Sequence, residues 1–268
     1  MTALIVFSGY VAAFSMGGVL GLIGAGGSIL TVPILVYLFE VSPSLATVYS
    51  LFIVGLTALT GTFQYLRRDL IDVRAAALFG LPSLAGVILC RRLIVPAVPD
   101  PIWAGESFTM SKEQFVLVAF SAFMLLAAVA MVRSGRRAAP DESASRPSAL
   151  FVLLDGLVVG AVTGFVGAGG GFLIVPALVL LVRLPVKVAV GTSLLVIAIK
   201  SLAGFGSDAL AGVEVDWGFL AAFSAISIAG GVVGERLNGR VSSARLKPAF
   251  GWFVLAMGTL VLTKELIL

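Results

Sequence analysis

Apolar residues along this chain form long, nearly uninterrupted runs that are separated by short charged or polar stretches. The runs lie at about 3–39, 45–66, 73–96, 113–132, 149–182, 188–207, 216–235 and 248–268. A helix needs about 20 apolar residues to cross the hydrocarbon core of a bilayer, and a continuous run fits a helix rather than a barrel strand. The runs at 3–39 and 149–182 are too long for one straight crossing. The pattern predicts an all-α polytopic membrane protein.

Both long runs contain the same glycine-rich motif, which ends at a proline. The two copies, at 17–33 and 160–176, are offset by 143 residues. Clustered glycines and a proline interrupt a membrane helix where neighbouring protein can satisfy the freed backbone groups. Each long run is therefore expected to form two helices that meet at the dense clusters 24–27 and 167–171, as a hairpin of short spans or as a re-entrant pair. The sparser glycines of the motif have an alternative use in close helix packing.

The offset continues well beyond the motif. The matched pairs include Ala46 with Ala189, Ser50 with Ser193, Gly61 with Gly204 and, after a slip of one residue, Asp72 with Asp216, Gly86 with Gly230 and Arg92 with Arg236. This repetition predicts a first transmembrane repeat at 1–132 and a second at 149–268, each with about four membrane segments. The polar, Pro- and Ser-containing stretch 133–148 is expected to be a cytoplasmic linker between them.

Basic residues predict that the two repeats are inverted. If each long run returns the chain to its starting side, 13 of the 18 lysines and arginines share one side and 4 lie on the other. The loops on the basic side are then 67–74, 133–148, 183–187 and 236–247. Eight single crossings would divide the basic residues almost evenly, so the positive-inside rule favours inversion, with these loops in the cytoplasm. Arg91 and Arg92 do not follow the rule.

Composition supports the membrane assignment and narrows the chemistry. Hydrophobic residues make up 59% of the chain and charged residues 12%, whereas a soluble domain carries about 25% charged residues. The chain has no histidine and one cysteine, Cys90, which argues against histidine-based catalysis, zinc and cysteine-rich metal sites and intramolecular disulfides. We therefore expect no enzyme activity, metal or other cofactor. The net charge of +4 reports membrane topology rather than a nucleic-acid partner.

A polar stripe follows the glycine motif in each half. Its members share the spacing of one helix face and are Ser50, Thr57 and Gly61 in the first half and Ser193, Lys200 and Gly204 in the second. Lys200 lies well inside its apolar run, where a charged lysine costs ~3 kcal/mol and should face protein, water or an anion. Alternatively, Lys200 reaches the membrane surface or pairs with Asp208 or Asp155.

The helix breaks and the polar stripe together define a candidate anion site. A helix that starts after each break presents free N–H groups and a positive dipole end, both of which attract anions. The predicted substrate-binding residues are Gly26, Gly27, Ser28, Ser50, Thr57, Gly169, Gly170, Gly171, Thr192, Ser193 and Lys200. With its site at breaks in two repeats, the chain has the pattern of a secondary transporter.

The paired motif, G-x3-G-x2-G-x-G-G-x5-P at the head of each half, resembles the sulfite exporter TauE/SafE family. The residues that carry it are Gly17, Gly21, Gly24, Gly26, Gly27, Pro33, Gly160, Gly164, Gly167, Gly169, Gly170 and Pro176. The stretches 46–51 and 189–194 and the pair Asp216-Trp217 also look like family features. The resemblance implies a multi-pass inner-membrane transporter that often exports small anions, typically sulfite or organosulfonates such as sulfoacetate.

Several alternatives stay open at this point. A passive anion channel with the same fold and a membrane subunit of a larger assembly both fit the sequence. A carrier of this kind needs a small anionic substrate, the lipid bilayer and an energy source, because the chain has no nucleotide-binding motif. The sequence does not say whether a coupling ion is a proton or sodium, nor does it give the oligomeric state.

Overall fold

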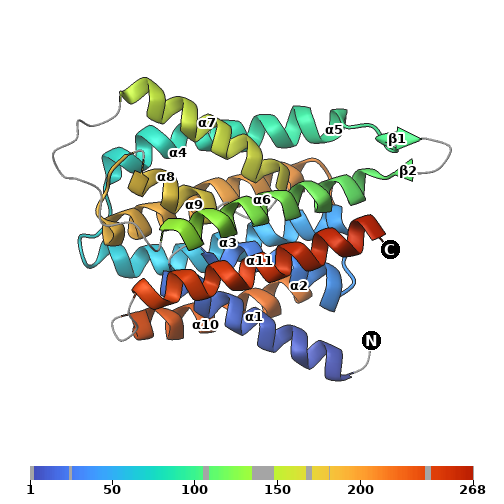
Figure 1. Ribbon diagram of the computed structural model, residues 1–268, viewed down its shortest axis with the longest axis horizontal. Coiled ribbons are helices and arrows are strands. Elements are labelled where there is room, and N and C mark those ends of the chain that lie inside the picture. The colour runs from blue at the N-terminus through green and yellow to red at the C-terminus, as the bar shows by residue number, and fades with distance from the viewer. Residues whose placement is uncertain are drawn as a thin grey trace.

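A computed structural model describes residues 3–23, 26–104, 109–134, 148–166, 171–180, 182–238 and 243–267. The helices of the first half are α1 Ala3–Ile23, α2 Thr31–Leu38, α3 Pro43–Leu66, α4 Val73–Leu89, α5 Val95–Ala97 and α6 Lys112–Ser134. Those of the second half are α7 Ala149–Val166, α8 Gly171–Leu180, α9 Val186–Leu210, α10 Trp217–Asn238 and α11 Ser243–Ile267. Two short strands, β1 Trp103–Ala104 and β2 Thr109–Met110, pair antiparallel beyond α5. The long helices follow one axis, and α1 begins at the end of the bundle where α11 finishes (Figure 1).

The predicted class, an all-α membrane protein, is confirmed. Within the described part of the chain, four helices are long and apolar enough to cross a membrane, namely Pro43–Leu66, Val73–Ala97, Lys187–Leu210 and Trp217–Leu237. Shorter apolar helices occupy Val6–Leu22, Gly27–Leu38 and Ala149–Phe165. The second of the long helices is continuous because a π-helical turn, Cys90–Ile94, joins α4 to α5.

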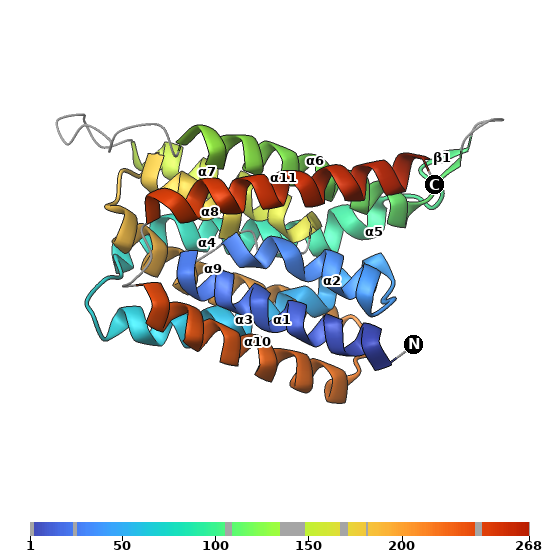
Figure 2. The same ribbon diagram turned by 60° about the horizontal axis from the view of Figure 1, so that its bottom comes forward.

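Each of the two long apolar runs forms two helices, as the glycine clusters predict. In the first run, α1 is followed by a 3-10 helix, Gly26–Leu30, and then by α2, which comes back beside α1 toward the end where the chain starts (Figure 2). Gly27 lies so close to the backbone of Met16 and Leu20 that a Cβ atom there would collide with it. The second run forms α7 and α8. Residues 24–25 and 167–170 lie outside the described residues, as does most of the predicted linker 133–148.

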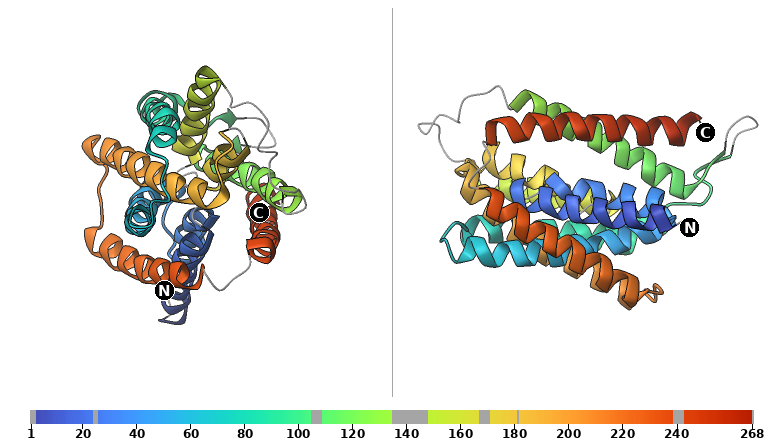
Figure 3. Two further views of the ribbon diagram at one scale, coloured as in Figure 1. Left: turned by 90° about the vertical axis from the view of Figure 1, so that its left-hand side faces the viewer. Right: turned by 90° about the horizontal axis from the view of Figure 1, so that it is seen from below.

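Seen along its long axis, the bundle has a central pair of helices between two outer pairs (Figure 3). The central pair is α3 and α9, and the outer pairs are α1 with α10 and α4 with α7. Helices α6 and α11 pack together along one side. Under the repeat, α1 corresponds to α7 and α4 corresponds to α10. The α1–α10 pair and the α7–α4 pair are therefore equivalent contacts, each between one half of the chain and the other.

Glycines make the outer pairs close. A Cβ atom on Gly17 of α1 would strike the Ser227 carbonyl of α10, and one on Gly160 of α7 would strike the Ser83 carbonyl of α4. These four positions correspond under the repeat. The alternative role of the sparser motif glycines, as helix-packing positions, is therefore confirmed for Gly17 and Gly160.

Backbone geometry also repeats along the chain. Glu40 and Arg183 both have positive φ, 56° and 60°, although few residues other than glycine adopt it. Each lies in the turn that follows the second helix of a broken run. A second pair, Asp69 at 51° and Gly212 at 88°, lies in the turns after α3 and α9. Both pairs are offset by 143 residues.

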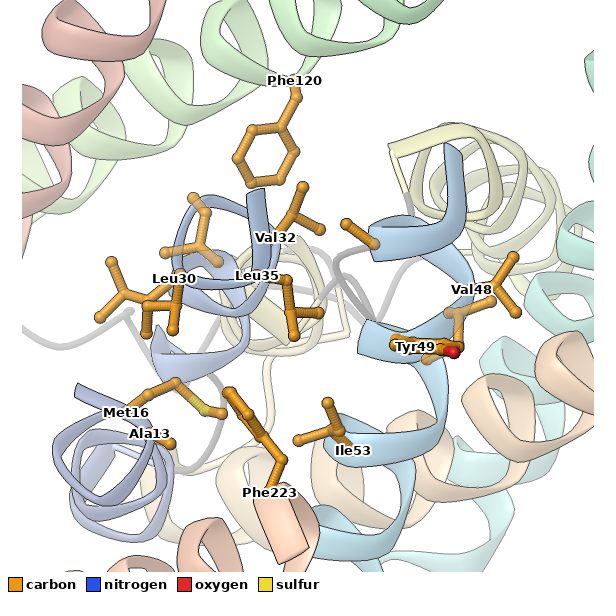
Figure 4. Close-up of a cluster of buried hydrophobic side chains, with 14 of the residues drawn as sticks. Ala13, Met16, Leu30, Val32, Leu35, Val48, Tyr49, Ile53, Phe120 and Phe223 are labelled. Atoms are coloured by element: carbon orange, nitrogen blue, oxygen red, sulfur yellow. The ribbon is translucent and has the colours of Figure 1, made fainter. Parts of the chain in front are cut away.

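The larger hydrophobic core lies where the first broken run meets the rest of the bundle. Figure 4 shows side chains from several elements converging there. They come from α1 (Ala13, Met16), the 3-10 helix and α2 (Leu30, Val32, Leu35), α3 (Val48, Tyr49, Ile53), α6 (Phe120) and α10 (Phe223). This packing holds the short helix α2 in place, since eight residues do not form a stable helix alone.

Candidate functional site

The candidate site lies around the crossing of α3 and α9. These helices run antiparallel, because Gly204 contacts Leu51 while Gly61 contacts Leu194. Leu51 and Gly61 are about 15 Å apart along α3 at 1.5 Å per residue. The crossing therefore brings the two halves of the chain together over about half of a ~30 Å hydrocarbon core.

Lys200 projects from this crossing toward α7. Its side chain is only 1% exposed, and its Nζ donates a hydrogen bond to Thr163 Oγ1 at 2.7 Å. Thr163 Oγ1 in turn donates to the Gly160 carbonyl at 3.1 Å. The alternative partners Asp208 and Asp155 are wrong, because Lys200 forms no ion pair with described residues and Asp208 pairs with Arg91 instead.

This setting leaves Lys200 without a counter-charge among the described residues. An ammonium group has three donors, and among the described residues Lys200 has one hydrogen-bond partner, a neutral hydroxyl. A buried charge without a counter-charge is strongly unfavourable, and an incoming anion would remove that penalty. Thr163 lies three residues before the end of α7, so the ammonium group is held near the C-terminal end of that helix.

The two stripe serines have equivalent but separate positions. Ser50 and Ser193 are both buried, and each donates to the carbonyl three residues earlier, that of Thr47 at 3.3 Å and that of Val190 at 2.7 Å. Because α3 and α9 are antiparallel, Ser50 lies level with Gly204, and Ser193 lies near the other end of the crossing. The structure does not bring the two hydroxyls together.

Thr57 and Lys200 occupy equivalent positions but point to opposite sides. Thr57 Oγ1 donates to the Ile53 carbonyl at 2.8 Å, and its methyl group lies against Gly231 of α10. Lys200 turns toward α7. One side of the crossing therefore has a short, internally bonded hydroxyl, and the other has a cation.

Thr192 holds a turn in place. Its Oγ1 accepts a hydrogen bond from the Asp72 backbone N–H at 2.9 Å, just before α4. The equivalent contact in the other half runs from the Asp216 N–H to the Tyr49 hydroxyl at 2.8 Å, just before α10. Each aspartate also caps its helix through its own carboxylate. The contact of Thr192 that the structure shows is thus a structural one.

The glycine clusters are described in part. Gly26 and Gly27 begin the 3-10 helix, where Gly27 and Ser28 are buried, and Gly171 is the buried first residue of α8. The other two predicted glycines, Gly169 and Gly170, lie outside the described residues.

Sequence reasoning missed Thr163, the partner of Lys200. A signal for it exists in the repeat. Thr163 stands where the first half has Leu20, and Lys200 stands where the first half has Thr57. Both differences make the second half more polar, and the structure joins the two changed residues by a hydrogen bond.

A second polar cluster, which sequence reasoning also missed, lies just beyond the C-terminal end of α4. Arg91 is buried, its Nη1 pairs with Asp208 Oδ2 at 2.6 Å, and its Nε donates to the Gly164 carbonyl at 2.8 Å. Arg92 Nε donates to Ser207 Oγ at 3.1 Å. The π-helical turn at Cys90–Ile94 lies at this point, and such turns are frequent at functional sites. The ion pair neutralises Arg91, one of the two residues that break the positive-inside rule.

Comparison with known proteins places this arrangement in a family. The model of the family described as "Sulfite exporter TauE/SafE" matches residues 10–261. The chain belongs to this family. The TauE/SafE match begins within α1 and ends within α11, and it includes the α3–α9 crossing. It is a transporter family rather than an enzyme family, so the chain is a multi-pass membrane transporter.

Relatives of this TauE/SafE protein carry the same kind of name. A "Probable membrane transporter protein" of Xylella fastidiosa (strain 9a5c) is 32% identical, and the match covers 93% of this chain and 92% of the relative. "Probable membrane transporter protein YunE" of Bacillus subtilis is 28% identical over 85% of this chain and 86% of its own length. A relative in Methanocaldococcus jannaschii is 29% identical over 74% and 70%. No solved structure matches the chain.

Proposed function

We propose that this TauE/SafE protein is a secondary transporter for a small sulfur-containing oxyanion such as sulfite, sulfoacetate or a related organosulfonate. It would act by alternating access, in the export direction, across the cytoplasmic membrane. The family description supports the substrate class. The observation that carries the proposal is Lys200, a buried ammonium group held by Thr163 near the C-terminal end of α7 with no carboxylate paired to it in the described chain.

The proposed topology has two inverted repeats of four membrane segments, the first of each folded as a hairpin. Three features support it: the exchanged outer pairs, the antiparallel α3–α9 crossing, and the hydrogen bonds of Asp72 and Asp216 at matched positions. The repeats would be residues 1–132 and 149–268, and the linker 133–148 would lie in the cytoplasm. Asp208 neutralises Arg91, one of the two arginines that do not follow the positive-inside rule, so Arg91 no longer counts against this topology.

Site asymmetry fits a single anion per transport cycle. Thr57 and Lys200 flank the crossing on opposite sides, and only Lys200 offers a charge. A sulfonate or sulfite group bound there would accept from the ammonium donors and would meet the N–H groups that follow the second break. The first break, with Gly27 and Ser28, would contribute its backbone from the other repeat.

Flux into proteoliposomes tests the proposal. Labelled sulfite, sulfoacetate, sulfate and chloride would be offered to the wild type and to Lys200→Ala, with Lys187→Ala as the matched control because Lys187 is an exposed lysine at the start of the same helix. A charge-assisted hydrogen bond contributes ~1.5–3 kcal/mol, so we expect Lys200→Ala to lower flux of the substrate about tenfold or more. Lys187→Ala should transport at the wild-type rate.

Two results would count against the proposal. Wild-type flux by Lys200→Ala for every anion would remove Lys200 from the site. Ohmic single-channel currents in planar bilayers, without saturation of flux in the millimolar range, would replace the carrier with a passive channel.

A further inference from the structure

A cavity lies away from Lys200, in a groove between the end of α3 and the end of α10. Its volume is about 780 Å³. Three arginines line it: Arg67 and Arg68 at the end of α3, and Arg236 on α10. Leu59, Phe63 and Leu66 of α3 form its apolar part. We call this the arginine groove.

The arginines of this groove are not neutralised by ion pairs. In the described residues the single ion pair is that of Arg91 with Asp208, on other helices. Arg67 lies over the Phe63 ring, 4.3 Å from its centroid, which leaves the edge of its guanidinium group free to bind. Glu235 is the acid that Arg68 faces, and it is buried beneath Gly61. Three guanidinium groups against one carboxylate leave the groove positive.

The apolar part of the groove faces outward. Leu59, Phe63 and Leu66 are 47%, 55% and 54% exposed on a helix long and apolar enough to span the bilayer. From Leu59 to Arg67 the helix rises about 12 Å, close to the ~15 Å of hydrocarbon in one leaflet. A small free anion would leave this apolar surface uncovered, whereas an acyl chain would cover it.

The matched positions at the opposite end of the bundle are bonded differently. The positions equivalent to Glu235 and Arg236 are Arg91 and Arg92, and they bond to Asp208 and Ser207 of α9. At the groove, Glu235 and Arg236 do not bond α10 to α3 by an ion pair within the described residues. At the other end, Arg91 and Arg92 bond the chain that follows α4 to α9. The groove-lining arrangement is therefore not repeated at these matched positions.

We propose that the arginine groove binds an anionic phospholipid of the leaflet at that surface, with its phosphate on the three arginines and an acyl chain along Leu59 and Phe63. Guanidinium groups suit phosphate because they donate two parallel hydrogen bonds. Basic pockets between membrane helices are known to bind anionic headgroups. The cytoplasmic placement of this leaflet rests on the proposed topology, but the binding itself does not.

Native mass spectrometry of the full chain in detergent tests the site, with phosphatidylglycerol and phosphatidylcholine of the same acyl chains as probes. The groove variant is Arg67→Gln/Arg68→Gln/Arg236→Gln. The matched control is Arg74→Gln/Arg183→Gln/Lys187→Gln, which removes three exposed basic residues near the starts of α4 and α9 that do not line the groove. We expect the wild type to prefer phosphatidylglycerol, the groove variant to bind it about tenfold or more weakly, and the control to bind as the wild type.

Further measurements distinguish a bound phospholipid from a free anion in the groove. Millimolar phosphate or sulfite should not displace phosphatidylglycerol, because neither ion can cover the apolar wall; displacement would make the groove a free-anion site and overturn the proposal. Equal loss in both triple variants, or no preference over phosphatidylcholine, would also overturn it. Arg236→Gln alone, with thermal unfolding as a check, serves if the triple variant does not fold. Since no transport is measured, failure here leaves the Lys200 experiment untouched.

Discussion

Removal of the Asp208 carboxylate should expose the cost of burying Arg91. The Arg91 side chain is 4% exposed and that of Asp208 12% exposed, and their atoms Nη1 and Oδ2 are 2.6 Å apart. In Asp208→Ala the guanidinium group would keep the Gly164 carbonyl as an acceptor but lose its counter-charge. Breaking a buried pair costs ~3–5 kcal/mol. Because one acceptor remains, we expect the lower end, ~3 kcal/mol, or a change of about 150-fold in the folding equilibrium.

The measurement is the free energy of unfolding in mixed micelles, with Glu214→Ala as the control because Glu214 is an exposed acid in the following turn. The control should change stability by no more than ~0.5 kcal/mol. Asp208→Asn keeps a carbonyl oxygen for Arg91 and should lose less than Asp208→Ala. If the free energy of unfolding of Asp208→Ala lies within ~0.5 kcal/mol of the wild-type value, the buried Arg91 does not depend on the Asp208 carboxylate as its counter-charge.

Two further predictions concern packing and topology. Gly160→Ala should destabilise the protein because its Cβ would strike the Ser83 carbonyl, whereas Gly206→Ala in α9 meets nothing within 4 Å and should be neutral or stabilising by up to ~1 kcal/mol in the same unfolding assay. Equal stability of the two variants would contradict the close packing of α4 and α7. Single cysteines at Ser44 and Arg183, in a Cys90→Ala background, should react with an impermeant thiol reagent from opposite faces of the membrane; reaction from the same face would exclude the inverted topology.

The sequence predicted the helical class and the breaks because both depend on local patterns. Run length sets the number of residues in a membrane helix, and the clusters near Gly27 and Gly171 mark where helical geometry ends. The same information could not give the partner of Lys200. Asp208 lies two turns away on the same helix, but the fold brings Arg91 to it from another helix.

The candidate site shows the same limit. Residues with equal spacing in two repeats look like one surface, yet an antiparallel crossing places Ser50 and Ser193 near opposite ends of it. Thr57 and Lys200 face away from one another for the same reason. The relative direction and register of α3 and α9 decide which repeated residues meet, and the spacing within each repeat does not encode them. The roles of these residues in binding remain predictions.

The two ends of the bundle differ at matched positions, and this difference bears on the transport cycle. Arg91 ties α4 to α9 through Asp208, whereas its counterpart Glu235 forms no ion pair with the described residues. The counterpart of Asp208 is Tyr65, which cannot pair with Glu235 as a charge. In an inverted transporter, opening one end while closing the other exchanges such matched contacts. In the proposed inverted topology, opening the end with Arg91 would break a buried ion pair, whereas the described residues hold no equivalent pair at the opposite end.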